Sequence, residues 1–328
     1  MLLHSYIVAK GEGKQTLASF LRAKLNLSWS KARELVVKHQ VRVAGQPTSD
    51  PAQRLKVGNR VEVHGFSPVS TTPKQGKKAP PKTKAPIHSG PMPIVVYEDD
   101  AVVVVNKPAG LTTMRHAEEK AEFGERGKHY LPSTLAELLP PLLGQPDRPL
   151  RAVHRIDRDT SGLVVFARTT KAEQNLTNQF REHTVERRYL ALVRGQPKPG
   201  KIESILVRDR GDGRRGTGTG EDGQDAITHV KLIEALGDFA LVECRLETGR
   251  THQVRIHLGE AGTPLCGERV YDRPANGKPF PDGSDAARPM LHAAKLGFKH
   301  PETDEKMSWT CPLPDDMAKL LEQMRNDD

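Results

Sequence analysis

Apolar residues near the start of the chain recur at i, i+3, i+4 and i+8, the spacing of an amphipathic helix. These residues are Leu17, Phe20, Leu21 and Leu25. A second helix is predicted over residues 28–39, with Ser28 as its N-cap. Short alternating strands are expected after it, at 41–43, 55–57 and 61–63, with glycine-containing turns between them. The pattern predicts a small compact module that combines two helices with a tight hairpin.

The remainder of the chain, residues 94–328, has the pattern of a mixed domain. Residues 101–105 (AVVVV) predict a buried strand, and residues 171–183 suit a helix. Further strands are expected at 163–167, 189–193, 230–234, 240–246 and 254–258. Insertions at about 114–133 and 208–226 are rich in glycine and charge and should form surface loops. Because strands outnumber helices and do not alternate with them, the predicted fold class is α+β around a mixed, largely antiparallel sheet.

The distribution of charge separates the two parts of the chain. Residues 1–93 contain 16 Lys and Arg against 4 Asp and Glu, whereas the remaining residues contain 34 against 37. The net charge of +9 therefore comes from the first part, which favours a polyanionic partner, either nucleic acid or an anionic membrane surface. Within it, residues 65–93 contain seven prolines, five lysines and no acid. We expect this segment to be an extended, flexible linker.

Other compositional features exclude some classes of protein. The chain shows no signal peptide and no apolar run long enough to cross a membrane. Its three cysteines, Cys244, Cys266 and Cys311, form no CxxC pair, and an odd number does not suit a disulfide framework. We therefore expect a cytoplasmic protein with reduced thiols and no membrane partner.

The N-terminal module resembles a known RNA-binding domain. Its segment SWSKARELVVKHQVRVAGQ is similar to the S4 domain, and the predicted extent of the domain is 1–64. Lys31 and Lys38 are seven residues apart, so they share one face of the second helix and are candidates for contact with RNA. The alternative is a capping subdomain whose charges are only solvated.

The densest cluster of polar groups lies in residues 151–163, RAVHRIDRDTSGL. Such a cluster between two apolar strands is either an ion-pair network or a catalytic site. Asp157 stands out because Arg155 and Arg158 flank it, which would favour its ionised form and prepare it to act as a nucleophile or base.

This cluster resembles the HRLDxxTSG signature of the RluA-type pseudouridine synthases, with isoleucine in place of leucine. Four more blocks match that family in the same order: YEDDAVVVVNKPAGL, RRYLALVRG, LETGRTHQVRIHL and RPMLHAAKLGFKHP. A Gly-Asp pair that usually follows the fourth block of the family is Gly267–Glu268 here, which keeps the charge. The resemblance implies a cofactor-independent isomerase that detaches uracil from C1′ of a uridine in RNA, rotates it and rejoins it through C5.

The resemblance also implies roles for single residues. Asp157 matches the essential aspartate, which acts by attack on C1′ or by abstraction of the 2′-proton. Arg250 matches the arginine expected to pair with it, and Tyr189 matches the tyrosine that stacks on the target base. Arg155 matches a residue that fills the gap left by the extruded nucleotide, whose unstacking costs a few kcal/mol. The simpler alternatives are ion-pair partners for the two arginines and a core position for Tyr189.

Competing functions remain open at this point. A metal site made by His154, His252 and His257 is disfavoured, since residues 252 and 257 should point to opposite faces of the predicted strand at 254–258. A catalytically inactive RNA-binding protein and a glycoside hydrolase are the alternatives from other classes. The S4-like module favours large-subunit ribosomal RNA as substrate, with transfer RNA as the second candidate. We expect a monomer.

Overall fold

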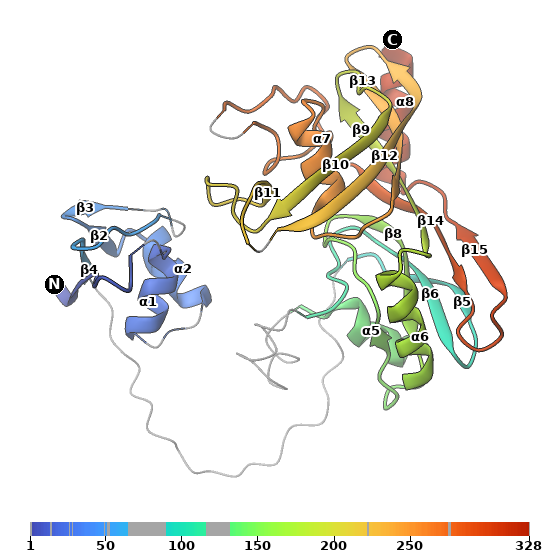
Figure 1. Cartoon of the computed structure of the whole chain (residues 1–328), viewed down its shortest axis with the longest axis horizontal. Coiled ribbons are helices and arrows are strands. Elements are labelled where there is room, and N and C mark those ends of the chain that lie inside the picture. Colours follow the sequence, from blue (N-terminus) through green and yellow to red (C-terminus); the bar gives the residue numbers. More distant parts are fainter. Residues whose placement is uncertain are drawn as a thin grey trace. The chain divides into compact units, whose positions relative to one another are not determined.

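The computed structural model describes residues 2–64, 90–115, 132–221, 223–274 and 277–327, except positions 14, 26, 28, 49, 51 and 52. Its contacts divide the chain into two compact units, Met1–Thr83 and Lys84–Asp328 (Figure 1). Most of the predicted linker, the predicted N-cap at Ser28 and most of the insertion at 114–133 lie outside the described residues. No helix in the described ranges is long and apolar enough to span a bilayer.

The N-terminal unit is a four-stranded antiparallel sheet with two helices, counted over its described residues. In chain order its elements are β1 (Leu2–Ile7), α1 (Leu17–Leu25), α2 (Trp29–Val37), β2 (Val41–Val43), β3 (Gln46–Pro47) and β4 (Arg60–His64). The helical stripe of α1 is buried as predicted, with Phe20 and Leu21 fully inaccessible. The strand predicted at 55–57 is wrong: Leu55 is buried, but its neighbour Arg54 makes only an isolated bridge to Thr16. The strand that completes the sheet is instead β1, which pairs with β4.

The second unit is built on one mixed sheet of eleven strands, counted over its described residues, in the order β11-β10-β12-β13-β9-β14-β8-β6-β5, with β15 on β14 and β7 on β8. The strands are β5 (Ile94–Glu98), β6 (Val102–Lys107), β7 (Arg151–Ala152), β8 (Ser161–Ala167), β9 (Glu186–Arg194), β10 (Gly200–Val207), β11 (Gly216–Thr217), β12 (Gln224–Leu236), β13 (Phe239–Leu246), β14 (Leu291–Lys299) and β15 (Lys306–Thr310). Only the short β14–β8 pairing is parallel among these strands. The α+β class and the largely antiparallel sheet are therefore confirmed.

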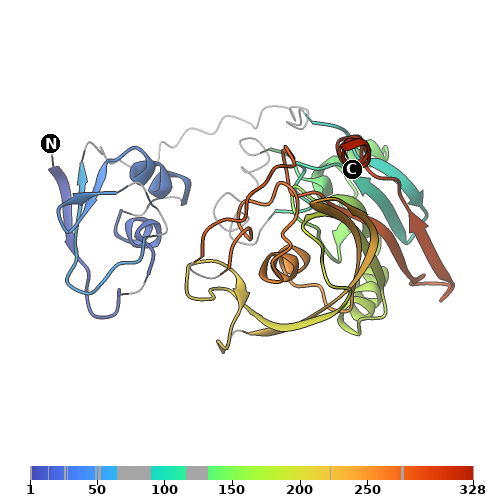
Figure 2. The ribbon, with the colours of Figure 1, turned by 90° about the horizontal axis from the view of Figure 1, so that it is seen from above.

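Helices cover both faces of this sheet. They are α5 (Leu135–Leu142), α6 (Thr170–Arg181), α7 (Gln253–Glu260) and α8 (Asp315–Asp327). Helices α5 and α7 pack on one face, α6 and α8 on the other. Figure 2 shows the sheet curving around α7, which is seen end-on. Side chains alternate along β9, so Tyr189 faces the α7 side and Leu192 faces α8.

One predicted element has the wrong type. The strand expected at 254–258 is the helix α7. Val254 and Leu258 are four apart, so a short apolar run fits a helix as well as a strand. The helix starts after His252, whose φ of 61° is left-handed. Gln253 then stabilises the start, because its Oε1 accepts hydrogen bonds from the Arg250 amide and the Thr248 hydroxyl.

Gly162 of the TSG turn allows β8 and β14 to approach. Its φ is +113°, and a Cβ at this position would lie 2.3 Å from the Ala293 carbonyl oxygen. Backbone strain and overlap with a neighbouring backbone therefore both exclude a side chain.

We predict that Gly162→Ala lowers the free energy of unfolding by about 3–5 kcal/mol, the sum of backbone strain and overpacking. In a Trp29→Phe background, the fluorescence of Trp309 reports urea unfolding of the second unit alone, since the chain has two tryptophans. Gly144→Ala is the matched control: its φ is +68° with open space around it, so about 1 kcal/mol is expected. Equal losses in the two variants would contradict the close-approach argument.

Candidate active site

Asp157 lies on the loop that joins β7 to β8 and faces a pocket of about 460 Å³. Its side chain is 20% exposed, so it is accessible to a ligand while most of its surface contacts protein. The charged and polar residues that line this pocket with it include Arg155, Arg187, Tyr189, Arg250, His252 and Arg255. Five different segments thus supply one cationic pocket around a single carboxylate.

The backbone around Asp157 is held on both sides. The Thr113 hydroxyl donates to the Ile156 carbonyl at 2.8 Å, directly before the aspartate. The Arg158 carbonyl, directly after it, accepts from the Gly110 amide at 2.9 Å and from Lys107 Nζ at 3.0 Å. The segment NKPAGLTT therefore holds the loop that carries Asp157 as a clamp, and this contact explains part of the sequence block at 97–111.

Lys107 is the buried centre of this clamp. It is fully inaccessible, and its Nζ also donates to the Pro108 and Leu111 carbonyls at 2.9 and 2.7 Å. Burial lowers the pKa of Lys107 to about 7. The three carbonyl acceptors oppose this effect, because only the ammonium form has three N–H donors. We conclude that the clamp is fully formed when Lys107 is protonated.

The ion-pair partner of Asp157 is Arg255, not Arg250 as the sequence predicted. Arg255 Nη1 lies 3.5 Å from Asp157 Oδ2. The same guanidinium donates from Nε and Nη2 to the two oxygens of Glu268, at 2.7 and 2.8 Å. The Glu268 side chain is completely buried and also accepts from the backbone amides of residues 269–271. The pKa of Glu268 is lowered: burial raises it, but the Arg255 bond and charge outweigh that effect.

Arg255 reaches Asp157 because α7 is a helix. His252 and Arg255 are three residues apart, so a helix places them on one side, where both approach Asp157. The resemblance to the family had instead implied Arg250 as the partner of Asp157. In the structure, Arg250 Nε donates to the Asp225 carbonyl at 2.9 Å. Arg250 still lines the pocket, so a role in catalysis or binding remains a prediction.

His252 lies between Asp157 and the hydroxyl of Tyr271. Its Nε2 lies 3.8 Å from Asp157 Oδ1, and its Nδ1 is 2.7 Å from the Tyr271 hydroxyl. Burial lowers the pKa of His252 against the opposing effect of Asp157, so the neutral imidazole is favoured. No cluster of three or more metal-binding side chains occurs among the described residues.

Tyr189 and Arg155 both reach the pocket. Tyr189 is 9% exposed on β9, and burial raises its pKa, which keeps the phenol neutral. Asp157 adds to this shift and therefore lies close enough to interact. Arg155 is exposed at the entrance. These positions suit stacking on a base and insertion into RNA, but the roles themselves remain predictions.

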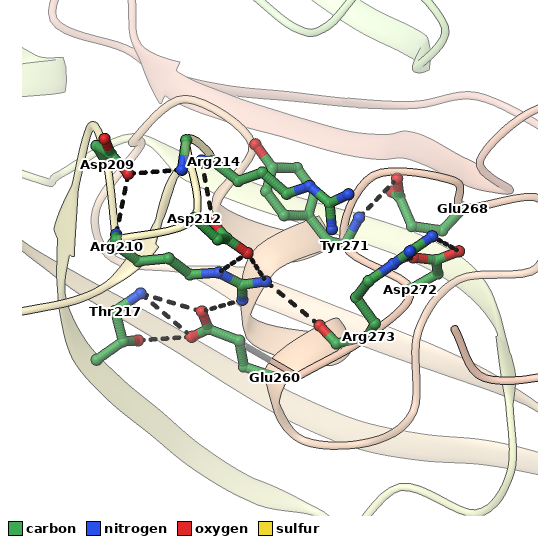
Figure 3. A network of polar contacts seen from close by, with 12 residues as sticks. Asp209, Arg210, Asp212, Arg214, Thr217, Glu260, Glu268, Tyr271, Asp272 and Arg273 are labelled. Atoms are coloured by element: carbon green, nitrogen blue, oxygen red, sulfur yellow. Dashed lines mark hydrogen bonds and ion pairs between the residues drawn. The ribbon is translucent and has the colours of Figure 1, made fainter. Parts of the chain in front are cut away.

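The predicted surface loop at 208–226 is more ordered than its composition suggested. Arg210 has a side chain only 2% exposed, with ion pairs at 3.0 Å to Asp212 and to Glu260 at the end of α7 (Figure 3). Glu260 also accepts from the amide and hydroxyl of Thr217 on β11. The network brings Arg215 close to the pocket, where its charge acts on His252 and Tyr271. A buried ion pair inside a glycine-rich segment has no signature in composition alone.

The two lysines predicted to bind RNA lie on the exposed side of the N-terminal unit. Lys38 forms an i,i+4 ion pair with Glu34, an acid between the two lysines that the prediction overlooked. Its charge is therefore partly compensated in the free protein.

Comparison with known proteins agrees with this geometry. A family model described as RNA pseudouridylate synthase matches residues 101–260. The "Ribosomal large subunit pseudouridine synthase D" of Neisseria meningitidis serogroup A is 36% identical over 310 residues, 92% of this chain and 77% of that protein. The chain belongs to the RNA pseudouridine synthase family.

Another relative matches nearly the whole of this RNA pseudouridine synthase. "Ribosomal large subunit pseudouridine synthase C" of Escherichia coli O157:H7 is 31% identical over 328 residues, 97% of this chain and 96% of that protein. Among solved structures, "Human RNA Pseudouridylate Synthase Domain Containing 4" matches with a TM-score of 0.55 and 22% identity, covering 71% of this chain and 93% of that one. That likeness supports the fold of the catalytic unit.

Three histidines with lowered pKa values should make the stability of the synthase depend on pH. Burial lowers the pKa of His154 to about 3 and those of His257 and His292 to about 4. Unfolded histidines have pKa values near 6.5. Between pH 6.5 and about 4 the unfolded chain binds more protons than the native one, so the free energy of unfolding falls as pH is lowered through this window.

We expect a loss of up to about 1.4 kcal/mol per pH unit for each histidine, measured by urea unfolding at Trp309. His257→Gln should reduce the slope of the free energy of unfolding against pH by the contribution of one histidine. The exposed His183→Gln is the control and should leave the slope unchanged. A stability that stays constant from pH 6.5 to 4.5 would show that these histidines are not held neutral.

Proposed function

We propose that this synthase isomerises uridines in large-subunit ribosomal RNA, with Asp157 as the catalytic residue. The observation that supports the proposal most directly is the position of Asp157: a carboxylate on a clamped loop, facing a pocket with five arginines among its lining residues. Two relatives that match more than nine-tenths of the chain have names that include "Ribosomal large subunit pseudouridine synthase".

The pocket supports a division of roles during the reaction. Asp157 attacks C1′ of the flipped uridine or removes its 2′-proton, and Arg255 positions the carboxylate. Tyr189 stacks on the uracil ring from β9. Arg155 enters the space that the nucleotide leaves in the RNA, where a cation is favourable. Arg250 contacts the substrate at the pocket wall rather than the aspartate.

We further propose that residues 1–64 form an S4-like RNA-binding domain and that residues 65–93 link it to the catalytic domain at 94–328. The excess of lysine and arginine in residues 1–93 supports this role, because each neutralised phosphate releases counterions. The proposal includes a cytoplasmic monomer, in line with three cysteines that form no disulfide in the structure.

Asp157→Asn keeps the size of the side chain and removes its charge. Pseudouridine formation should fall below detection, while the affinity for RNA changes by less than about 1.4 kcal/mol, a factor of ten. The measurement is tritium release from RNA labelled at uridine C5, since isomerisation exchanges that hydrogen. Asp159→Asn, two residues away with an exposed side chain, is the control and should remain active. Wild-type turnover in Asp157→Asn would disprove the assignment.

Removal of residues 1–93 should weaken RNA binding in a salt-dependent way. For irregular RNA, log affinity against log salt has a slope of about −0.7 per phosphate contact, so four lost contacts flatten it by about 3 units. The single-turnover rate at saturating RNA should stay close to wild type. Lys31→Gln with Lys38→Gln in the full chain should flatten the slope by at most about 1.4 units, less if Glu34 keeps Lys38 engaged. An unchanged slope after truncation would mean that the basic residues face only solvent.

A further inference from the structure

Arg187 is a buried cation in the pocket of Asp157, and no carboxylate in the described part of the chain pairs with it. It lies on β9 two residues before Tyr189, so both side chains face the pocket. Arg187 is 8% exposed. Among the described residues it makes one hydrogen bond, from Nη2 to the Glu247 carbonyl at 2.8 Å, and it lies over the Phe180 ring. Its Nε is buried without a partner.

The two buried arginines of the pocket differ in their charge balance. Arg255 is neutralised by Glu268 and Asp157. For Arg187, burial lowers the pKa and no carboxylate opposes the effect. An uncompensated buried charge costs several kcal/mol and persists where it serves a function. The cost indicates that a negative charge enters the pocket during the catalytic cycle.

The local sequence makes room for this guanidinium. A Cβ on Gly249 would lie 2.3 Å from Arg187 Nη1, so the side chain depends on a glycine at that position. Gly249 also lines the pocket, which places Nη1 at the pocket wall. Nη1 is thus the group that a ligand can reach.

RNA could bring two kinds of anion to Arg187: a backbone phosphate, or the uracil that is detached during the reaction. The burial of Arg187 distinguishes between them. Backbone phosphates stay at the entrance, where Arg155 and Arg181 are exposed. Arg187 is instead 8% exposed, beside the similarly buried Tyr189 on β9. We propose that Arg187 hydrogen-bonds a carbonyl oxygen of the detached uracil and stabilises its negative charge, an inference that rests on the proposed function.

The charge arises in a defined step. Heterolysis of the C1′–N1 bond leaves its electron pair on the ring, shared by N1 and the carbonyl oxygens. After rotation, C5 forms the new bond to C1′ as the bond from Asp157 to C1′ breaks or, on the glycal route, as Asp157 returns the proton to C2′. The C5 proton then passes to water and N1 takes up a proton. Arg187 transfers no proton. It stabilises the uracil anion after the C1′–N1 bond has broken and before the C1′–C5 bond forms, as preorganised donors do for other developing anions.

The test compares Arg187→Gln with Arg188→Gln. Arg188 is the next residue on β9 and pairs with Glu186 and Glu243 away from the pocket. At saturating RNA, Arg187→Gln should lower the single-turnover rate of tritium release by about 100-fold or more, and Arg188→Gln by less than about twofold. Affinity for RNA should change little in either variant.

Two further measurements separate catalysis from structure. Removing an uncompensated charge should leave the thermal midpoint of Arg187→Gln equal to or above wild type, whereas Arg255→Met should lower it because Glu268 loses its partner. In RNA that contains 5-fluorouridine, the departing ring is a weaker base and needs less stabilisation. The defect of Arg187→Gln, measured by mass spectrometry of the nucleosides, should then be several-fold smaller.

Other outcomes would overturn the inference. A lower affinity with an unchanged single-turnover rate would make Arg187 a phosphate anchor. A lower thermal midpoint together with equal defects on both RNAs would make it a structural residue. Failure of the wild type to release tritium from any RNA would instead reject the proposed function, so the two failures are distinguishable.

Discussion

The buried pair of Glu268 and Arg255 is the constraint on which the geometry of this site depends. A carboxylate with no solvent access is stable only when its oxygens are satisfied, and here two guanidinium bonds and three backbone amides satisfy them. The same bonds fix Arg255 in one orientation. Its remaining Nη1 lies 3.5 Å from Asp157 Oδ2, so the position of the Asp157 carboxylate depends on the pair of Arg255 and Glu268. The longer side chain of glutamate, where the family usually has aspartate, forms this pair through both of its oxygens.

The loop of Asp157 is held by backbone contacts as well as by charge. Thr113 fixes the residue before it and Lys107 the residue after it. Arg288 adds a third contact, to the Asp159 carbonyl at 3.0 Å. These groups come from segments far apart in sequence, yet none of them contacts the Asp157 side chain. The carboxylate is therefore immobilised without losing its access to the pocket, as a nucleophile or base requires.

The sequence predicted the fold class correctly, and its errors share a physical origin. Strongly periodic elements such as α1 and β6 were identified because burial enforces their pattern. The segment 254–258 satisfies the helical and the strand period at once, so its pattern did not decide between them. The pairing of Arg250 with Asp157 was implied by the resemblance, and in the structure Arg255 makes this ion pair. The buried arginines 187 and 210 gave no signal, because composition does not show which charges fold inside. Tertiary contacts determine both the helical conformation of 254–258 and the burial of the two arginines.

The titratable side chains of the pocket fall into two groups, those that are neutral and those that are charged. Burial keeps His154 and His252 in their neutral forms, and Tyr189 keeps its proton, so none of them adds charge beside the substrate. His154 uses its neutral Nε2 to accept the Val165 amide at 3.0 Å, which ties the catalytic loop to β8. The permanent charges are left to arginines, whose protonation does not change in the working range of pH. One of these, Arg187, has no carboxylate partner among the described residues, so an anion that enters the pocket would compensate its charge. A site arranged in this way favours the state of the reaction in which the base has detached over the states in which it is bonded to ribose.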